Sequence, residues 1–221
     1  MNEDKLKGFQ IYFKIIKDNL ENNENFLKNE GKKLLELLCD FYEYWEKADN
    51  KAHKVANENS AMRVVIESLW FPQLFYLTGN LLIGALDSMY QMLRFLLEGL
   101  EIGLILDCIE NFKSLSVIEK LYYAENIMRG KIIDYLENLI DNDTLDDLEK
   151  FYGELSSKWL HVPGYLKQLI EDTYKEGFPP ARALYFAKIN ERVSEFDELM
   201  KAMESFNKLA LKIIEYWEKL L

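Results

Sequence analysis

The stretch from Leu81 to Asp107 constrains the fold more than any other part of this chain. Many of its apolar residues recur in steps of three and four, the spacing of a helical stripe. Further apolar residues cover the other faces, so a helix formed here is apolar on nearly every side and belongs in an interior. The sequence therefore predicts an all-α domain built around a buried central helix. The stripe comprises Leu82, Leu86, Met89, Leu93, Leu96, Leu100 and Leu104.

One narrow face of this predicted helix is polar. Asp87, Gln91, Arg94, Glu98 and Glu101 follow one another at i, i+4, i+7, i+11 and i+14, which stacks their side chains along one line. We call these five residues the polar strip. Because the helix is too apolar for a broad solvent face, we expect the strip to line an internal groove, where buried charges need partners. The alternative is a simple i,i+4 pair of Arg94 and Glu98 on a solvated sliver.

The rest of the chain predicts amphipathic helices joined by short turns. We expect helices over 4–20, from 25 to beyond 45, and over 62–69, where Pro72 limits the third. Turns are expected at 22–25 and 78–80. Almost no sheet is expected.

Capping signals place the helices that follow. Ser116 and Glu119 form a capping box, with Ile118, Leu121 and Tyr122 facing the interior. Thr144 is the expected N-cap of a helix that ends near residue 161.

A long terminal helix is predicted from about Asn190 to Leu221, where apolar residues hold a heptad-like seam. The helix should pack this seam against the helix that contains residues 26–45, in the same chain or in a symmetry mate. We expect one all-α domain over 1–221, with Gly177 to Pro180 as the clearest place for a sub-boundary. The seam includes Phe196, Met203, Ala210 and Trp217.

Composition limits the classes of function and the compartment. The 221 residues are 49% hydrophobic, enough to bury about 70% of the unfolded surface in a core. The formal net charge of -11 disfavours a nucleic-acid partner.

Cys39 and Cys108 are expected to be buried small hydrophobes, which indicates a reducing, cytoplasmic location. No signal peptide is recognised at the N-terminus. The uncharged stretch Ser68 to Leu86 has the length of a membrane span, but Pro72 and the expected turn favour a soluble reading.

No cofactor or metal is predicted from the motifs. The chain has two histidines, His53 and His161, and neither lies in a Glu-x-x-His or His-Glu-x-x-His motif. The acidic turn from Asp141 resembles a calcium loop, but Asp146 and Tyr152 stand where Gly and Glu are required. His53, flanked by lysines, is most simply a surface residue.

His161 is the best candidate outside the central helix. A helix ending there, before Pro163, places the imidazole beside the last carbonyls, where a positive charge is favoured. We predict that His161 lies near Arg94 and Glu98, and these three are the candidate catalytic residues. Asp87, Gln91, Glu101 and Lys158 are the candidate ligand-binding residues. The alternative for His161 is a packed structural residue.

Two segments together resemble the HEPN superfamily of helical proteins. They are Arg94-Phe-Leu-Leu-Glu98 and Leu155-Ser-Ser-Lys-Trp-Leu-His161-Val-Pro163, within 80–165. Active HEPN ribonucleases carry Arg-x4-6-His, and here Ser156, Leu155 and Glu154 occupy the arginine positions. The resemblance implies a HEPN-like scaffold with the nuclease motif absent or degenerate.

Two functions from different classes remain open. The first is a non-enzymatic protein-interaction or oligomerisation module, acting on itself or on another protein. The second is an RNA-binding or RNA-cleaving protein that uses Arg94 and His161. A small-ligand pocket on the polar strip is a third hypothesis.

Overall fold

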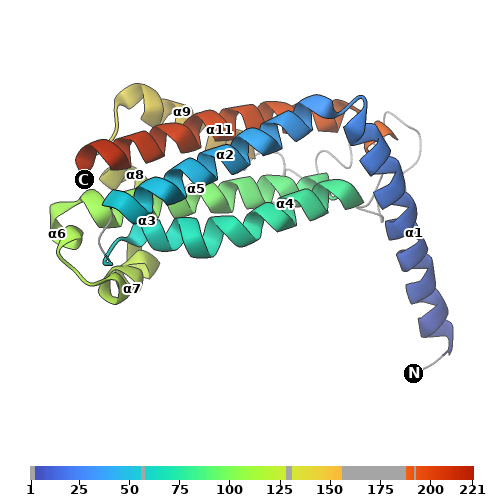
Figure 1. The fold of residues 1–221 in the computed structure, drawn as a ribbon, viewed down its shortest axis with the longest axis horizontal. Helices are drawn as coiled ribbons and strands as arrows, with labels where there is room; N and C mark the ends of the chain where they lie inside the picture. The colour runs from blue at the N-terminus through green and yellow to red at the C-terminus, as the bar shows by residue number, and fades with distance from the viewer. Residues whose placement is uncertain (1–2, 56–57, 128–130, 156–187, 192) are drawn as a thin grey trace.

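The computed structural model describes residues 3–55, 58–127, 131–155, 188–191 and 193–221. Regular structure over these residues is entirely helical, without a strand, as the sequence predicts. Long helices α2 (Lys32–Val55), α4 (Phe71–Ile83), α5 (Leu86–Cys108) and α11 (Val193–Leu220) form the bundle, and α1 (Glu3–Lys28) points away from one end of it (Figure 1). The other elements are α3 (Ala61–Val64), the π-helical η1 (Val65–Trp70), α6 (Glu110–Lys113), α7 (Val117–Ile127), α8 (Ile132–Leu136), α9 (Asn142–Leu155) and the 3-10 turn η3 (Ile189–Glu191).

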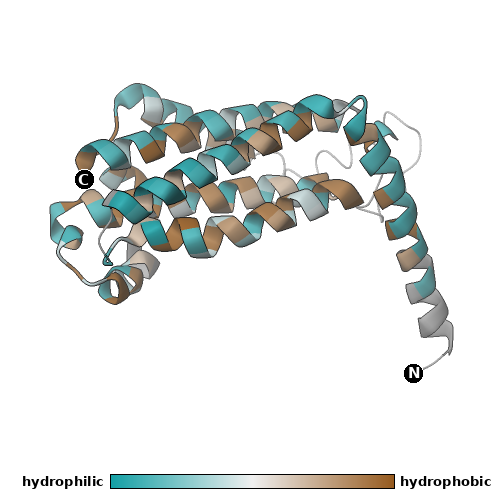
Figure 2. Ribbon diagram, in the orientation of Figure 1, coloured by the Kyte–Doolittle hydropathy of each residue, from teal (hydrophilic) through white to brown (hydrophobic). Residues whose placement is uncertain are grey.

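The buried centre of the bundle is α5. Every residue from Gly99 to Asp107 is buried, including the charged ones. This helix contacts α11 on one side and the run α3–η1–α4 on the other. Gly103 permits the close approach of α3, because a Cβ there would lie 3.0 Å from Met62 Cα. The predicted buried central helix is confirmed, and Figure 2 shows polar colour along the outward faces of α2 and α11.

Aromatic rings fill the space between α2, η1 and α11. The rings of Phe41 and Trp70 stack with centroids 4.8 Å apart, and Phe206 lies 5.2 Å from Phe41. All three are fully buried. Trp70 also donates its indole N–H to the Leu96 carbonyl over 3.3 Å, so no buried donor is left unpaired there.

The central helix begins at Leu86 rather than Leu81, and the predicted turn at 78–80 is wrong. Those residues lie inside α4, and the chain turns at Gly84, whose φ of 76° is left-handed. The Gly84 and Ala85 amides donate to the Leu81 and Asn80 carbonyls, which closes the helix end. Glycine is favoured where φ is positive, and Gly79 does not have a positive φ.

The sequence predicted that Pro72 limits the helix over 62–69, and this prediction is wrong. Helix continues from Ala61 to Ile83, with Pro72 in the first turn of α4. The turn before it, η1, is π-helical. In a regular α-helix the proline ring would clash with the carbonyl four residues back, and a π turn is one of the local distortions that accommodate such a ring.

The asparagines that predicted a turn at 22–25 lie within α1. Asn22 donates to the Asp18 carbonyl at 2.6 Å, within its own helix. Asn23 is buried and donates to the Leu82 carbonyl at 2.9 Å, while its Oδ1 accepts from the Ile189 amide at 2.8 Å. Tertiary hydrogen bonds therefore replace the turn, and α1 extends to Lys28.

Three smaller predictions need correction. The first concerns α7: Ile118, Leu121 and Tyr122 are exposed, although they were expected to face the interior. The capping box of the same helix is confirmed, since Ser116 N donates to Glu119 Oε2 at 2.9 Å. The cap of α9 is Asp141, which accepts from Thr144 N at 2.7 Å, so Thr144 is not the N-cap. Cys39 is exposed and Cys108 half-buried, and neither forms a disulfide.

The long terminal helix is confirmed, starting at Val193. Its seam residues Phe196, Met203, Ala210 and Trp217 are all buried. Helix α11 packs mainly against α5 and also against the expected α2. None of the helices over the described ranges is long and apolar enough to cross a membrane. The predictions on Gly177 to Pro180, Lys158 and His161 lie outside the described residues.

Candidate functional sites

The polar strip runs from the surface into the core along one side of α5. Gln91 is exposed, Asp87, Arg94 and Glu98 are half-buried, and Glu101 is completely buried. Arg94 Nε donates to Glu98 Oε1 at 2.8 Å, so the i,i+4 pair is confirmed. Burial of the strip therefore increases from Gln91 through the Arg94–Glu98 pair to Glu101, while Asp87 at the other end is again half-buried.

Tyr152 of α9 is the residue that the sequence analysis missed here. Its hydroxyl donates to Glu101 Oε2 at 2.8 Å, and the Arg94 guanidinium lies over its ring, 5.7 Å from the centroid. The sequence had placed Tyr152 only as a mismatch in a calcium loop. Nothing local in its sequence indicates the contact, which depends on how α9 packs against α5.

Burial sets the charge state at the inner end of the strip. Loss of hydration raises the pKa of the Glu101 carboxyl to about 8, against its hydrogen bond from Tyr152, which lowers it. Its other oxygen, Oε1, has no hydrogen-bond partner. Burial also raises the pKa of the Tyr152 hydroxyl, and the Glu101 charge adds to this. Arg94, Glu98 and Glu101 are thus brought together, while the expected groove and the place of His161 stay predictions.

A second polar centre surrounds Asp107 at the other end of α5. Its Oδ1 accepts from Ala61 N at 2.7 Å and Lys120 Nζ at 2.8 Å. Its Oδ2 accepts from Ser60 Oγ at 2.6 Å, and from Met62 N and Trp217 Nε1, each at 3.1 Å. We call these six residues the Asp107 hub.

The hub joins the start of α3 to α5, α7 and α11. Its carboxylate lies against the first amides of a helix, where the dipole favours negative charge. Lys120 and Asp107 are both buried, and Lys120 also donates to the Asn59 carbonyl at 2.8 Å. Because five donors already occupy the carboxylate, the hub is suited to holding helices together rather than to binding a ligand. The only signal of the hub in the sequence was one acid, Asp107, at the end of an apolar run.

Helix α4 exposes an uncharged apolar face. Phe71, Pro72, Phe75, Tyr76 and Gly79 are exposed and recur at helical spacing, and we call them the α4 face. Phe75 is 62% exposed and Tyr76 61%. No residue of α4 carries a charge. Large exposed apolar areas of this kind mark interaction surfaces.

Comparisons with protein-family models, with curated proteins and with solved structures found no match to this chain.

Proposed function

We propose that this chain is a non-enzymatic helical association module that pairs with a second copy of itself through the α4 face. The exposed aromatic rings of that face are the observation that carries the proposal. Interfaces are enriched in Phe and Tyr at their centres and depleted in charge there. Such a pairing would be isologous, with the same residues contributed by both copies.

The rings of the α4 face are held in place before any partner arrives. Phe71 and Phe75 meet edge to face with centroids 5.4 Å apart, and Phe71 also packs 5.2 Å from the half-buried Trp45 of α2. Rings fixed by neighbours lose little conformational entropy on binding. This favours a surface that is built for contact.

Charge restricts the face through which a second copy could dock. Each chain carries a net charge of -11, so two copies repel each other over most orientations. Contact through a helix without charged residues brings the fewest like charges together. The proposal keeps the HEPN-like scaffold that the resemblance implies, and the all-α architecture supports it.

The RNA-cleaving alternative depends on Arg94 and His161. Arg94 is engaged by Glu98 and by the Tyr152 ring, and His161 lies outside the described residues. No contact over the described ranges favours this alternative above self-association.

Size-exclusion chromatography with light scattering tests the proposal. We expect a dimer at micromolar concentration, and a monomer for Phe75→Glu, which places two like charges in the interface. Phe13→Glu is the matched control, because Phe13 is 69% exposed on α1 and lies off the α4 face. A monomeric parent chain, or a dimer that Phe75→Glu leaves intact, would overturn the proposal.

A further inference from the structure

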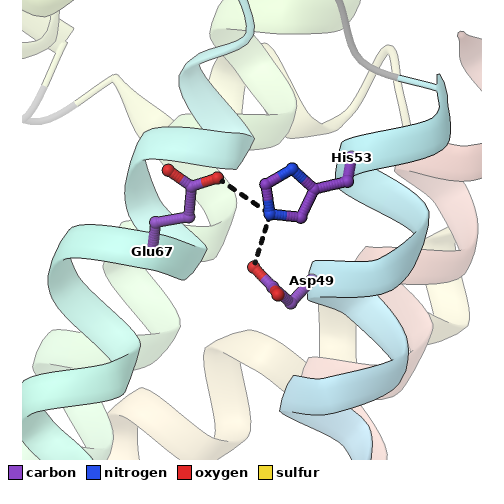
Figure 3. Close-up of side chains that lie close together, drawn as sticks. All are labelled: Asp49, His53 and Glu67. Carbon is purple, nitrogen blue, oxygen red and sulfur yellow. Dashed lines mark ion pairs between the residues drawn. The ribbon is translucent and has the colours of Figure 1, made fainter.

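Three ligand-type side chains meet where α2 packs against η1. Asp49 and His53 lie four residues apart on one face of α2, and Glu67 faces them from η1 (Figure 3). The His53 ring directs Nε2 at both carboxylates, with Asp49 Oδ1 at 3.7 Å and Glu67 Oε1 at 3.5 Å. One atom from each of the three residues lies within 4.8 Å of the others.

From this arrangement we infer that Asp49, His53 and Glu67 bind a divalent transition-metal ion, with Zn²⁺ as the best fit. Imidazole nitrogen and carboxylate oxygen are both ligands that zinc takes at about 2.0 to 2.2 Å. Tetrahedral ligands at that distance lie about 3.3 Å from one another. The two separations from Nε2 are close to this value, and the two carboxylate oxygens lie within 4.8 Å of each other, so side-chain adjustments would bring the three atoms onto one ion with an open fourth position.

Hydrogen bonds between His53 and the two carboxylates explain this geometry less well than a bound cation does. At 3.5 and 3.7 Å the imidazole nitrogen is too far from either carboxylate for a good hydrogen bond. The two contacts of His53, drawn as dashed lines in Figure 3, are ion pairs only if the imidazole is protonated. A cation placed among the three ligand atoms, which lie within 4.8 Å of one another, would instead bind all three side chains together.

Arg63 supports the orientation of one ligand. Its Nε donates to Glu67 Oε1 at 2.7 Å from one turn earlier in the same helical run. Carboxylate ligands of metal sites are commonly held by such hydrogen bonds. With Arg63 counted, the neutral-imidazole cluster carries a net charge of -1, which a divalent cation would convert to +1.

The nitrogen ligand decides between kinds of cation. Calcium and magnesium take oxygen ligands almost exclusively, and calcium takes six to eight of them. An imidazole with two carboxylates suits zinc, cobalt or nickel better. The site is half-exposed, so solvent reaches its open position.

Zinc titration of the full chain tests the inference. The parent for all measurements is Cys39→Ser, because an exposed thiol on the same helix would bind zinc on its own account. Cys108 needs no replacement, since burial raises the pKa of its thiol to about 12. Calorimetry with ZnCl₂ should show one saturable site per chain, and His53→Gln or Glu67→Gln should weaken it about tenfold or more.

Two controls keep the result unambiguous. Glu43→Gln removes an exposed acid from the same helix and should leave zinc affinity unchanged. Imidazole NMR resonances, assigned with His53→Gln, should show the His53 ring shifting at one equivalent of zinc. The inference is overturned if uptake is not saturable, if His53→Gln binds as the parent does, or if the other histidine shifts instead.

Discussion

Burial of Glu101 couples the protonation of its carboxyl to folding. The folded pKa of about 8 lies above the ordinary value of 4.5, so the folded state holds a proton that the unfolded state releases between these values. The contribution of Glu101 to the stability of the folded state is fully present below pH 4.5 and is lost as pH rises toward 8. Over this window the group lowers the free energy of unfolding by about 1.4 kcal/mol per pH unit.

The substitution Glu101→Gln isolates this effect. The amide keeps the shape of the protonated acid and still accepts the Tyr152 hydroxyl, but it does not titrate. We expect the variant to gain stability over the parent as pH is raised from 5 to 8, measured as the difference in urea unfolding free energy. A difference that is constant with pH would show that Glu101 is ionised in the folded state throughout.

Asp107 is expected to be among the least replaceable polar residues that the structure describes. Asp107→Asn keeps the shape, removes the charge opposite buried Lys120, and turns an amide toward groups that are all donors. Breaking one partner of a buried pair typically costs about 3 to 5 kcal/mol of unfolding free energy. Asp147→Asn, at an exposed pair with Lys208, should cost about 1 kcal/mol or less. Equal costs in chemical denaturation would contradict the hub's structural role.

Residue patterns were a poor guide to the inside of α7. Apolar periodicity predicted Ile118, Leu121 and Tyr122 as interior, yet over residues 117–124 the buried side chain is Lys120. The ammonium is drawn inward because Asp107 is already there, on another helix. Local hydrophobicity contains no information about a distant carboxylate, so this inversion was not predictable from the segment itself.

At the scale of elements, helix existence was predictable and several boundaries were not. The 3.6-residue spacing alone indicated α5 and α11. Thr-Gly-Asn at 78–80 and the asparagines at 22–25 look like turns, but their segments gain more by packing as continuous helix. The site followed the same rule: Arg94 and Glu98 share one helix and were found, whereas Tyr152, Asp107 and the Asp49–Glu67 cluster depend on contacts between helices.

Two glycines of the same run give opposite predictions. Gly84→Ala forces a side chain into left-handed backbone and should destabilise the fold by about 1 kcal/mol or more. At Gly79 an added Cβ meets nothing within 4 Å, inside a helix. Gly79→Ala should therefore raise stability by about 0.5 to 1 kcal/mol. Thermal melting of both variants checks this, and a loss of stability at Gly79 would argue for the turn at 78–80 after all.

At the scale of the whole molecule, the last turns of α11 hold the bundle closed. Trp217 is fully buried and donates to Asp107, so Trp217→Ala leaves a large cavity and removes a donor. We expect a cost of about 3 to 5 kcal/mol in denaturant unfolding. Leu220→Ala, one turn later and 48% exposed, is the control and should be close to neutral. Near-neutral unfolding of Trp217→Ala would mean that the seam opens in solution.

The Asp107 hub also has a consequence for the order of folding. Its side-chain donors lie 13, 47 and 110 residues away along the chain, at Lys120, Ser60 and Trp217. A partly folded chain that buries α5 before α7 and α11 have docked strands a dehydrated carboxylate, which raises the free energy of that intermediate. Closing such long loops is slow, because their entropy is lost before the contacts form. The hub thus destabilises partly folded chains, and it makes the docking of α11 a condition for burying α5.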